Sequence, residues 1–182
     1  MDAVYGELNR SNGTDAFGNV LTLAEGPLDL TWHHASTTSE FLGEFFSLRS
    51  AAFGLDANEV RHSIGYLVNE LLENAIKFRH PGDIRIETSI EDGLFEISVS
   101  NLIDVTTAER FRVLLDEITS RDPGELLIER IEANAEDETS SASGLGLLTL
   151  MNDYGAKLGW RFAGEEGSGA VRLDTIAALP LT

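Results

Sequence analysis

Apolar and polar residues in the middle of the chain follow the spacing of an amphipathic helix. In residues 64–78, which read IGYLVNELLENAIKF, apolar side chains return every three or four positions. Asp56 followed by Glu59 is typical of a helix start, because an acceptor side chain and a glutamate three residues later cap the first turn. Pro81-Gly82 ends the pattern. The spacing therefore predicts a long helix over 57–79.

Shorter periodic segments predict further strands and helices. Strict alternation is typical of a half-buried strand, and Asp92-Gly93 is typical of a hairpin turn. A second capping-box pattern begins at Thr106, and Asp122-Pro123 is a further helix start. The predicted strands are 28–33, 83–90, 94–99, 158–163 and 170–176. The predicted shorter helices are 39–53, 106–120, 123–135 and 144–154.

This order of hairpins and helices predicts an α+β fold. We expect a two-layer α/β sandwich in which the 57–79 helix packs across a mixed, mostly antiparallel sheet covered by helices on one face. Residues 28–182 form the predicted domain, whereas residues 1–27 are a polar N-terminal segment that is either loose or an edge element. Residues 136–143, EDETSSAS, are acidic and small, which predicts a poorly ordered segment.

Composition narrows the possible functions. The net charge of −18 repels phosphate backbones and anionic lipids, so we expect no nucleic-acid or membrane partner, although a merely solvated surface explains much of this charge. The absence of cysteine excludes disulfides, thiolate metal sites and cysteine nucleophiles. No apolar run is long enough to span a membrane, and the N-terminus lacks a signal-peptide pattern. A cytoplasmic location is therefore expected.

One polar line on the predicted long helix could carry chemistry. At 100° per residue, Glu70, Asn74 and Lys77 lie at about 0°, 40° and −20°, along the edge of the apolar stripe. The Asn74 amide oxygen suits Mg²⁺, and Glu70 could hold a water or accept a hydroxyl proton. Lys77 could meet phosphate oxygens as a point charge. The alternative is a solvated helix face with an ordinary hydrogen bond between neighbouring turns.

A glycine-rich segment opens the last predicted helix. In the sequence SGLGLL, Gly144, Leu145 and Gly146 could let backbone N–H groups approach an anion at the helix N-terminus. The spacing differs from that of the dinucleotide-binding and Walker A loops. A glycine pair at a tight helix start can also be a packing device, and the segment alone leaves both interpretations open.

Together the two segments resemble a known superfamily. Residues 70–78, ELLENAIKF, resemble the N-box of the GHKL (histidine-kinase-like) ATPases, and residues 143–151, SGLGLLTLM, resemble their glycine box. The order of elements agrees over about residues 28–176. The resemblance is closest to anti-sigma-factor serine/threonine kinases and implies a Bergerat-type ATP-binding fold that uses ATP and Mg²⁺.

By position, the resemblance assigns a role to each candidate residue. It makes Glu70 the general base and Asn74 the Mg²⁺ ligand. It places Lys77 and the backbone of Gly144, Leu145 and Gly146 at the phosphates. Residues 136–143 correspond to the lid over ATP.

One element of the superfamily is missing. Its Asp-x-Gly-x-Gly motif carries the aspartate that reads the adenine amino group, and here Ser100 stands at that position without the glycines. A hydroxyl accepts a hydrogen bond more weakly than a carboxylate. Asn101 or Asp104 could compensate. A subgroup of SiaB-like partner-switching kinases shares such a weakened motif.

Two hypotheses about function follow from the resemblance. The first is an ATP-dependent serine/threonine kinase that phosphorylates a small STAS-like regulatory protein in an anti-sigma type of partner switching. The second is a degenerate GHKL domain that acts as a non-catalytic protein-binding switch. Either form could be a homodimer, and neither the partner nor the stimulus follows from the sequence.

Overall fold

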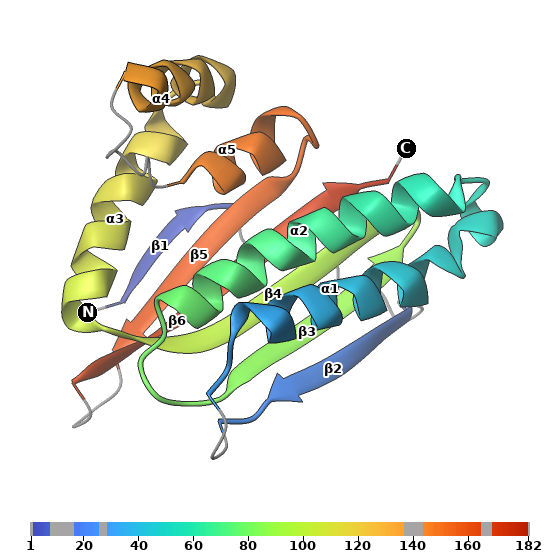
Figure 1. Cartoon of the computed structure of the whole chain (residues 1–182), viewed down its shortest axis with the longest axis horizontal. Coiled ribbons are helices and arrows are strands. Elements are labelled where there is room, and N and C mark those ends of the chain that lie inside the picture. The colour runs from blue at the N-terminus through green and yellow to red at the C-terminus, as the bar shows by residue number, and fades with distance from the viewer. Residues whose placement is uncertain (1, 8–16, 26–28, 137–143, 165–168, 182) are drawn as a thin grey trace.

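The computed structural model contains one six-stranded sheet with α1 and α2 packed across a face of it (Figure 1). It describes residues 2–7, 17–25, 29–136, 144–164 and 169–181. The strands lie in the order β1-β5-β6-β4-β3-β2. Their bounds are β1 Ala3–Gly6, β2 Phe17–Leu23, β3 Ile84–Glu91, β4 Leu94–Asp104, β5 Lys157–Gly164 and β6 Ala170–Pro180. The helices are α1 Trp32–Ser47, the 3-10 turn η1 Ser50–Phe53, α2 Ala57–Lys77, α3 Val105–Ser120, α4 Pro123–Glu136 and α5 Leu145–Asn152.

The predicted α+β two-layer architecture is confirmed. All five strand pairs in the described part of the chain are antiparallel, so this sheet is more regular than the mixed sheet expected from the sequence. Side chains from both layers form a continuous apolar core whose largest fully buried members are Trp160, Phe46, Phe95 and Phe162. None of the described helices is long and apolar enough to cross a membrane.

The predicted strand at 28–33 is wrong. Residue 31 is instead the N-cap of α1, where the Thr31 N–H donates to Nδ1 of His34 at 2.9 Å. The helix then buries Ala35, Leu42 and Phe46 at helical spacing. Six alternating residues are a weak strand signal, and here the local cap and the longer buried stripe prevail. The two outer strands of the sheet, β1 and β2, come from the first 27 residues instead.

The long helix α2 forms close to its predicted bounds. The Asp56 carboxylate accepts hydrogen bonds from the Asn58 and Glu59 N–H groups and caps the first turn. Helix α1 can approach α2 closely because position 43 of α1 is glycine. A methyl group on Gly43 would lie 2.7 Å from the Arg61 carbonyl oxygen of α2. The buried stripe of α2 consists of Val60, Ile64, Leu67, Val68, Leu71, Leu72, Ala75 and Ile76.

The β3–β4 hairpin turns at Asp92-Gly93, as predicted, with both residues at positive φ. Strand β4 continues to Asp104, further than expected. Side chains alternate between the two faces of a strand, so Asn101 and Ile103 face the helices while Ser100 faces the opposite side. This register decides which polar residues of β4 can reach a site under the helices.

Helix α3 begins one residue before its expected start. Its N-cap is Asp104, whose carboxylate accepts hydrogen bonds from the Thr107 N–H at 2.7 Å and the Thr107 hydroxyl at 2.8 Å. The capping box expected at Thr106 is therefore not the helix start. Helix α4 follows α3 at an angle, and Glu117 on α3 pairs with Arg130 on α4 at 2.7 Å (Figure 1). The start of α5 lies beside both helices, because a methyl group on Gly144 would lie 3.1 Å from the Arg130 guanidinium and 3.3 Å from the Leu114 side chain.

Candidate functional site

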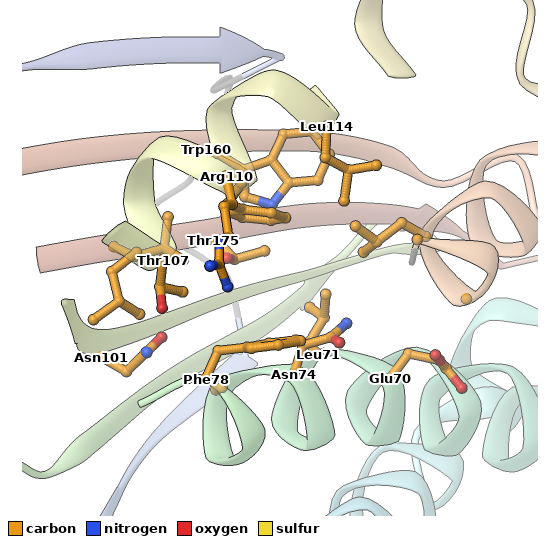
Figure 2. Close-up of a pocket in the computed structure, with 17 residues that line it drawn as sticks. Glu70, Leu71, Asn74, Phe78, Asn101, Thr107, Arg110, Leu114, Trp160 and Thr175 are labelled. Carbon is orange, nitrogen blue, oxygen red and sulfur yellow. The ribbon is translucent and has the colours of Figure 1, made fainter. Parts of the chain in front are cut away.

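A pocket of about 360 Å³ lies between α2 and α3, over β4, β5 and β6. Figure 2 shows α2 below it, α3 above it and the start of α5 at one end. The lining residues are Glu70, Leu71, Asn74, Ala75, Phe78, Asn101, Ile103, Thr107, Arg110, Phe111, Leu114, Gly144, Gly146, Leu147, Trp160, Leu173 and Thr175. A concave, mostly apolar site with a few polar groups is typical of small-molecule binding.

Helix α2 contributes one predicted acid and one predicted amide to the pocket. Glu70 and Asn74 lie one turn apart and both line it, half-buried. Lys77 does not line it; its ammonium lies 5.1 Å from the centre of the Phe78 ring. The angular positions explain the difference, because Phe78, at about 80°, falls inside the face bounded by Glu70 and Leu71, whereas Lys77 falls outside it.

The Glu70 carboxylate is directed toward the start of α5 (Figure 2). A methyl group added to Gly146 would overlap Glu70 Oε2 and lie 2.7 Å from its Cδ, so the acid occupies the space that this glycine leaves. Burial raises the pKa of the Glu70 carboxyl, and the neighbouring charge of Glu73 raises it further. The pocket therefore holds a carboxyl group that is more basic than usual.

The glycine segment forms the end wall of the pocket. Gly144 is the N-cap of α5 with φ of 90°, a conformation that favours glycine, and its carbonyl accepts from the Leu148 N–H at 3.0 Å. Gly144 and Gly146 line the pocket, whereas Leu145 packs against the core. Of the segment expected to act as a lid, residues 137–143 lie outside the described part of the chain.

The three polar candidates of β4, Ser100, Asn101 and Asp104, lie in different surroundings. Only Asn101 lines the pocket, where it is 4% exposed. The prediction that Ser100 occupies the adenine-reading position does not fit this register, because its hydroxyl donates to Asp174 at 2.6 Å on the opposite face. The Asp104 carboxylate caps α3 instead of lining the pocket, and these hydrogen bonds lower its pKa. Leu102 also points away from the pocket, so it does not block it.

The lining residues that were not expected from the sequence include Trp160, Thr175 and Arg110. Trp160 and Thr175 are cross-strand partners on β5 and β6, and both are more than nine-tenths buried. The Trp160 Nε1 atom is buried without a hydrogen-bond partner in the described structure. Arg110 extends from α3 into the pocket opening (Figure 2) and has no ion-pair partner among the described residues. Only the strand register and the position of α3 bring these residues together, so no sequence motif marks them.

No cluster of three or more histidine or acidic residues in the described ranges could hold a metal ion by itself. On α2, the pocket is lined by two side chains with oxygens that can bind a metal ion, Glu70 and Asn74. This pair suits Mg²⁺, which keeps several waters and is commonly held by one or two protein oxygens together with substrate phosphates.

Comparison with known proteins identifies the fold. No family model and no curated protein matches this chain. Among solved structures, the crystal structure of the SiaB–SiaC complex from Pseudomonas aeruginosa contains a chain that is similar, with a TM-score of 0.59 and 16% sequence identity. The alignment covers 87% of this chain and 89% of that chain. At this identity, the likeness establishes a shared fold over nearly the whole length.

Proposed function

We propose that this chain is a cytoplasmic regulatory protein of the GHKL type that binds Mg·ATP in the α2/α3 pocket. It phosphorylates serine or threonine on a small STAS-like partner protein. The observation that carries this proposal is the joint presence of Glu70, Asn74 and Gly146 around one pocket, since these residues come from the two segments that resemble the N-box and the glycine box.

The residues of the pocket suit the two ends of a nucleotide. Glu70 lies at one end, against Gly146 of α5, while Asn101 and Phe78 lie toward the other end and Asn74 lies between them (Figure 2). Asn74 and the phosphates bind Mg²⁺ on the Glu70 side of the pocket. The base enters the second end, which is largely apolar. The cavity volume lies within the range of small-ligand sites.

Phosphoryl transfer in this pocket depends on positioning and charge. Mg·ATP supplies the transferred phosphoryl group. Glu70 accepts the proton of the partner hydroxyl while the hydroxyl oxygen bonds to the γ-phosphorus and the bond to the β,γ-bridging oxygen breaks, which releases ADP. The raised pKa of Glu70 makes its carboxylate a better proton acceptor. Arg110 stabilises negative charge at the pocket opening.

The structural neighbour supports the proposed type of partner. That protein was crystallised as a SiaB–SiaC complex, so a chain with this fold associates with a second protein there. For this chain we propose a partner-switching role of the same kind. The negative charge of −18 favours a protein partner over nucleic acid.

A phosphotransfer assay tests the kinase proposal. The full chain is incubated with Mg·ATP labelled at the γ-phosphate and with the STAS-domain proteins encoded in the same genome. Label should transfer to a serine or threonine of one of them. Glu70→Gln should reduce the initial rate about 10²-fold or more, the usual minimum contribution of a general base, while the fold is retained. Transfer at an unchanged rate by Glu70→Gln would exclude Glu70 as the base.

A second candidate is a non-catalytic protein-binding switch with the same fold. It is favoured by the absent Asp-x-Gly-x-Gly motif, since Asn101 is the only polar residue of β4 that lines the pocket. A switch of this kind binds its STAS-like partner without Mg·ATP and transfers no label. Partner binding measured with and without Mg·ATP therefore separates the two candidates.

A further inference from the structure

An unpartnered donor lies in the wall of the pocket. Trp160 is 1% exposed, and its indole Nε1–H has no acceptor in the described structure. Figure 2 shows this nitrogen directed toward the space between α3 and α2. Buried polar groups nearly always have a partner, and leaving one unpaired is unfavourable. Tryptophan can only donate, so the missing group must be an acceptor.

The surroundings hold the indole in place. The Phe111 ring of α3 packs edge-on against it, with 6.2 Å between ring centroids. Thr175 is the cross-strand neighbour of Trp160 on the same face of the sheet. The pocket wall, which is largely apolar here, therefore holds the rigid indole N–H of Trp160 beside the hydroxyl of Thr175. The N–H is sealed from bulk water, so an outside acceptor reaches it only by entering the pocket and moving side chains.

We propose that Trp160 fixes the nucleobase, with its Nε1–H donating to an unsubstituted ring nitrogen of adenine. This inference rests on the proposed function and names a residue that orients the base. Adenine offers ring nitrogens that accept hydrogen bonds and one amino group that donates. The Asn101 side-chain oxygen, also in the pocket wall, can accept from the adenine amino group, while its Nδ2 donates to the Leu102 carbonyl oxygen at 3.3 Å. A ring nitrogen is then available to Trp160.

Calorimetric titrations of Mg·ATP and of Mg·tripolyphosphate, which has no base, test the role of the indole. Trp160→Phe keeps an aromatic ring but removes the N–H. We expect about tenfold weaker binding of Mg·ATP, which corresponds to about 1.4 kcal/mol, and unchanged binding of Mg·tripolyphosphate. Trp32→Phe is the matched control, because Trp32 is 61% exposed on α1, and it should bind both ligands like the wild type.

Two results of this titration would overturn the role of Trp160. Equal Mg·ATP affinity in Trp160→Phe and wild type would mean that the indole only packs or binds a buried water. Equal losses for Mg·ATP and Mg·tripolyphosphate would mean a general disturbance of the pocket. In both cases wild-type Mg·ATP binding persists and the proposed function stands. A wild type that binds no Mg·ATP overturns both.

A second measurement avoids the risk that Trp160→Phe does not fold. The chain has two tryptophans, so ¹⁵N-labelled Trp32→Phe has a single indole N–H resonance, that of Trp160. Saturation with Mg·ATP should move this resonance downfield, as hydrogen bonding to an acceptor requires, while Mg·tripolyphosphate should leave it in place. A resonance that does not move downfield at saturating Mg·ATP would overturn the inference.

Discussion

Gly146 at the start of α5 lies directly against the Glu70 carboxylate on α2. The carboxylate occupies the space that a side chain at position 146 would fill. The two segments that resemble the glycine box and the N-box therefore meet through this pair. The contact gives Gly146 a structural role, because the absence of a side chain leaves room for the Glu70 carboxylate against the start of α5.

Gly146→Ala should displace Glu70 without unfolding the protein. The added methyl group overlaps only the end of a flexible side chain, and alanine favours the helix by about 0.8–1 kcal/mol. We expect an unchanged or raised thermal midpoint and a phosphotransfer rate at least about tenfold lower. Gly65→Ala is the matched control, since the nearest atom to its added methyl group, the Ser39 carbonyl oxygen, would lie 3.8 Å away. Full activity of Gly146→Ala would show that the Glu70 position is not critical.

Glu70→Gln should stabilise the protein near neutral pH. Burial raises the pKa of Glu70 in the folded state, so its stabilising contribution is present below the ordinary pKa of 4.5 and is lost as pH rises through the folded-state pKa. Glutamine does not ionise, so the variant keeps its stability as pH rises. The difference in denaturation midpoint should be largest above the folded-state pKa of Glu70 and should narrow as pH falls toward the ordinary value of 4.5. A variant less stable than the wild type near pH 7 would contradict the electrostatic account.

Arg110→Ala should weaken Mg·ATP binding about three- to tenfold. The guanidinium at the pocket opening is free to pair with phosphate, but its exposure and salt screening limit the gain. The difference from the wild type should shrink as salt is raised in calorimetric titrations. Arg85→Ala removes the same charge from the opposite face of the sheet and should have no effect. Equal losses in the two variants would indicate a general effect of net charge.

Asn101→Asp, and not Ser100→Asp, should increase the preference for ATP over GTP. A charged acceptor gains roughly 1.5–3 kcal/mol against about 1 for a neutral one, so the ratio of affinities should rise by up to about tenfold. Ser100 lies on the other face beside Asp174, which is 4% exposed, so an aspartate there should lower stability by charge repulsion. Competition titrations of ATP and GTP measure the ratio. An improved preference in Ser100→Asp would contradict the register-based account.

The long helix and the central hairpin were predictable because their signals are local and strong. A cap at Asp56, a stripe over about five turns and the Asp92-Gly93 turn each specify structure within a few residues. The 28–33 segment shows the limit of this reasoning. Its short alternation resembles a strand, and only packing against α2 reveals that Ala35 belongs to a buried helical stripe.

The sequence predicted the pocket residues best where they lie on a single helix. Glu70 and Asn74 follow from helical spacing alone, but the same spacing did not distinguish Lys77 from Phe78 at the pocket edge. On β4, a shift of one residue reverses the face of every side chain, so only the observed register separates Asn101, which lines the pocket, from Ser100, which does not. Trp160 has no partner nearby in sequence, and its place in the pocket depends on pairing with β6.

Calorimetric titration of Mg·ATP into the wild type and Asn74→Ala tests the central claim most directly. The account predicts that the wild type binds ATP in a Mg²⁺-dependent manner. Asn74→Ala, which alters the half-buried proposed ligand at the edge of the core, should lose binding or its Mg²⁺ dependence at an unchanged thermal midpoint. Equal Mg·ATP affinity in the two proteins, or no binding by the wild type, would contradict the claim that the α2/α3 pocket is a Mg·ATP site.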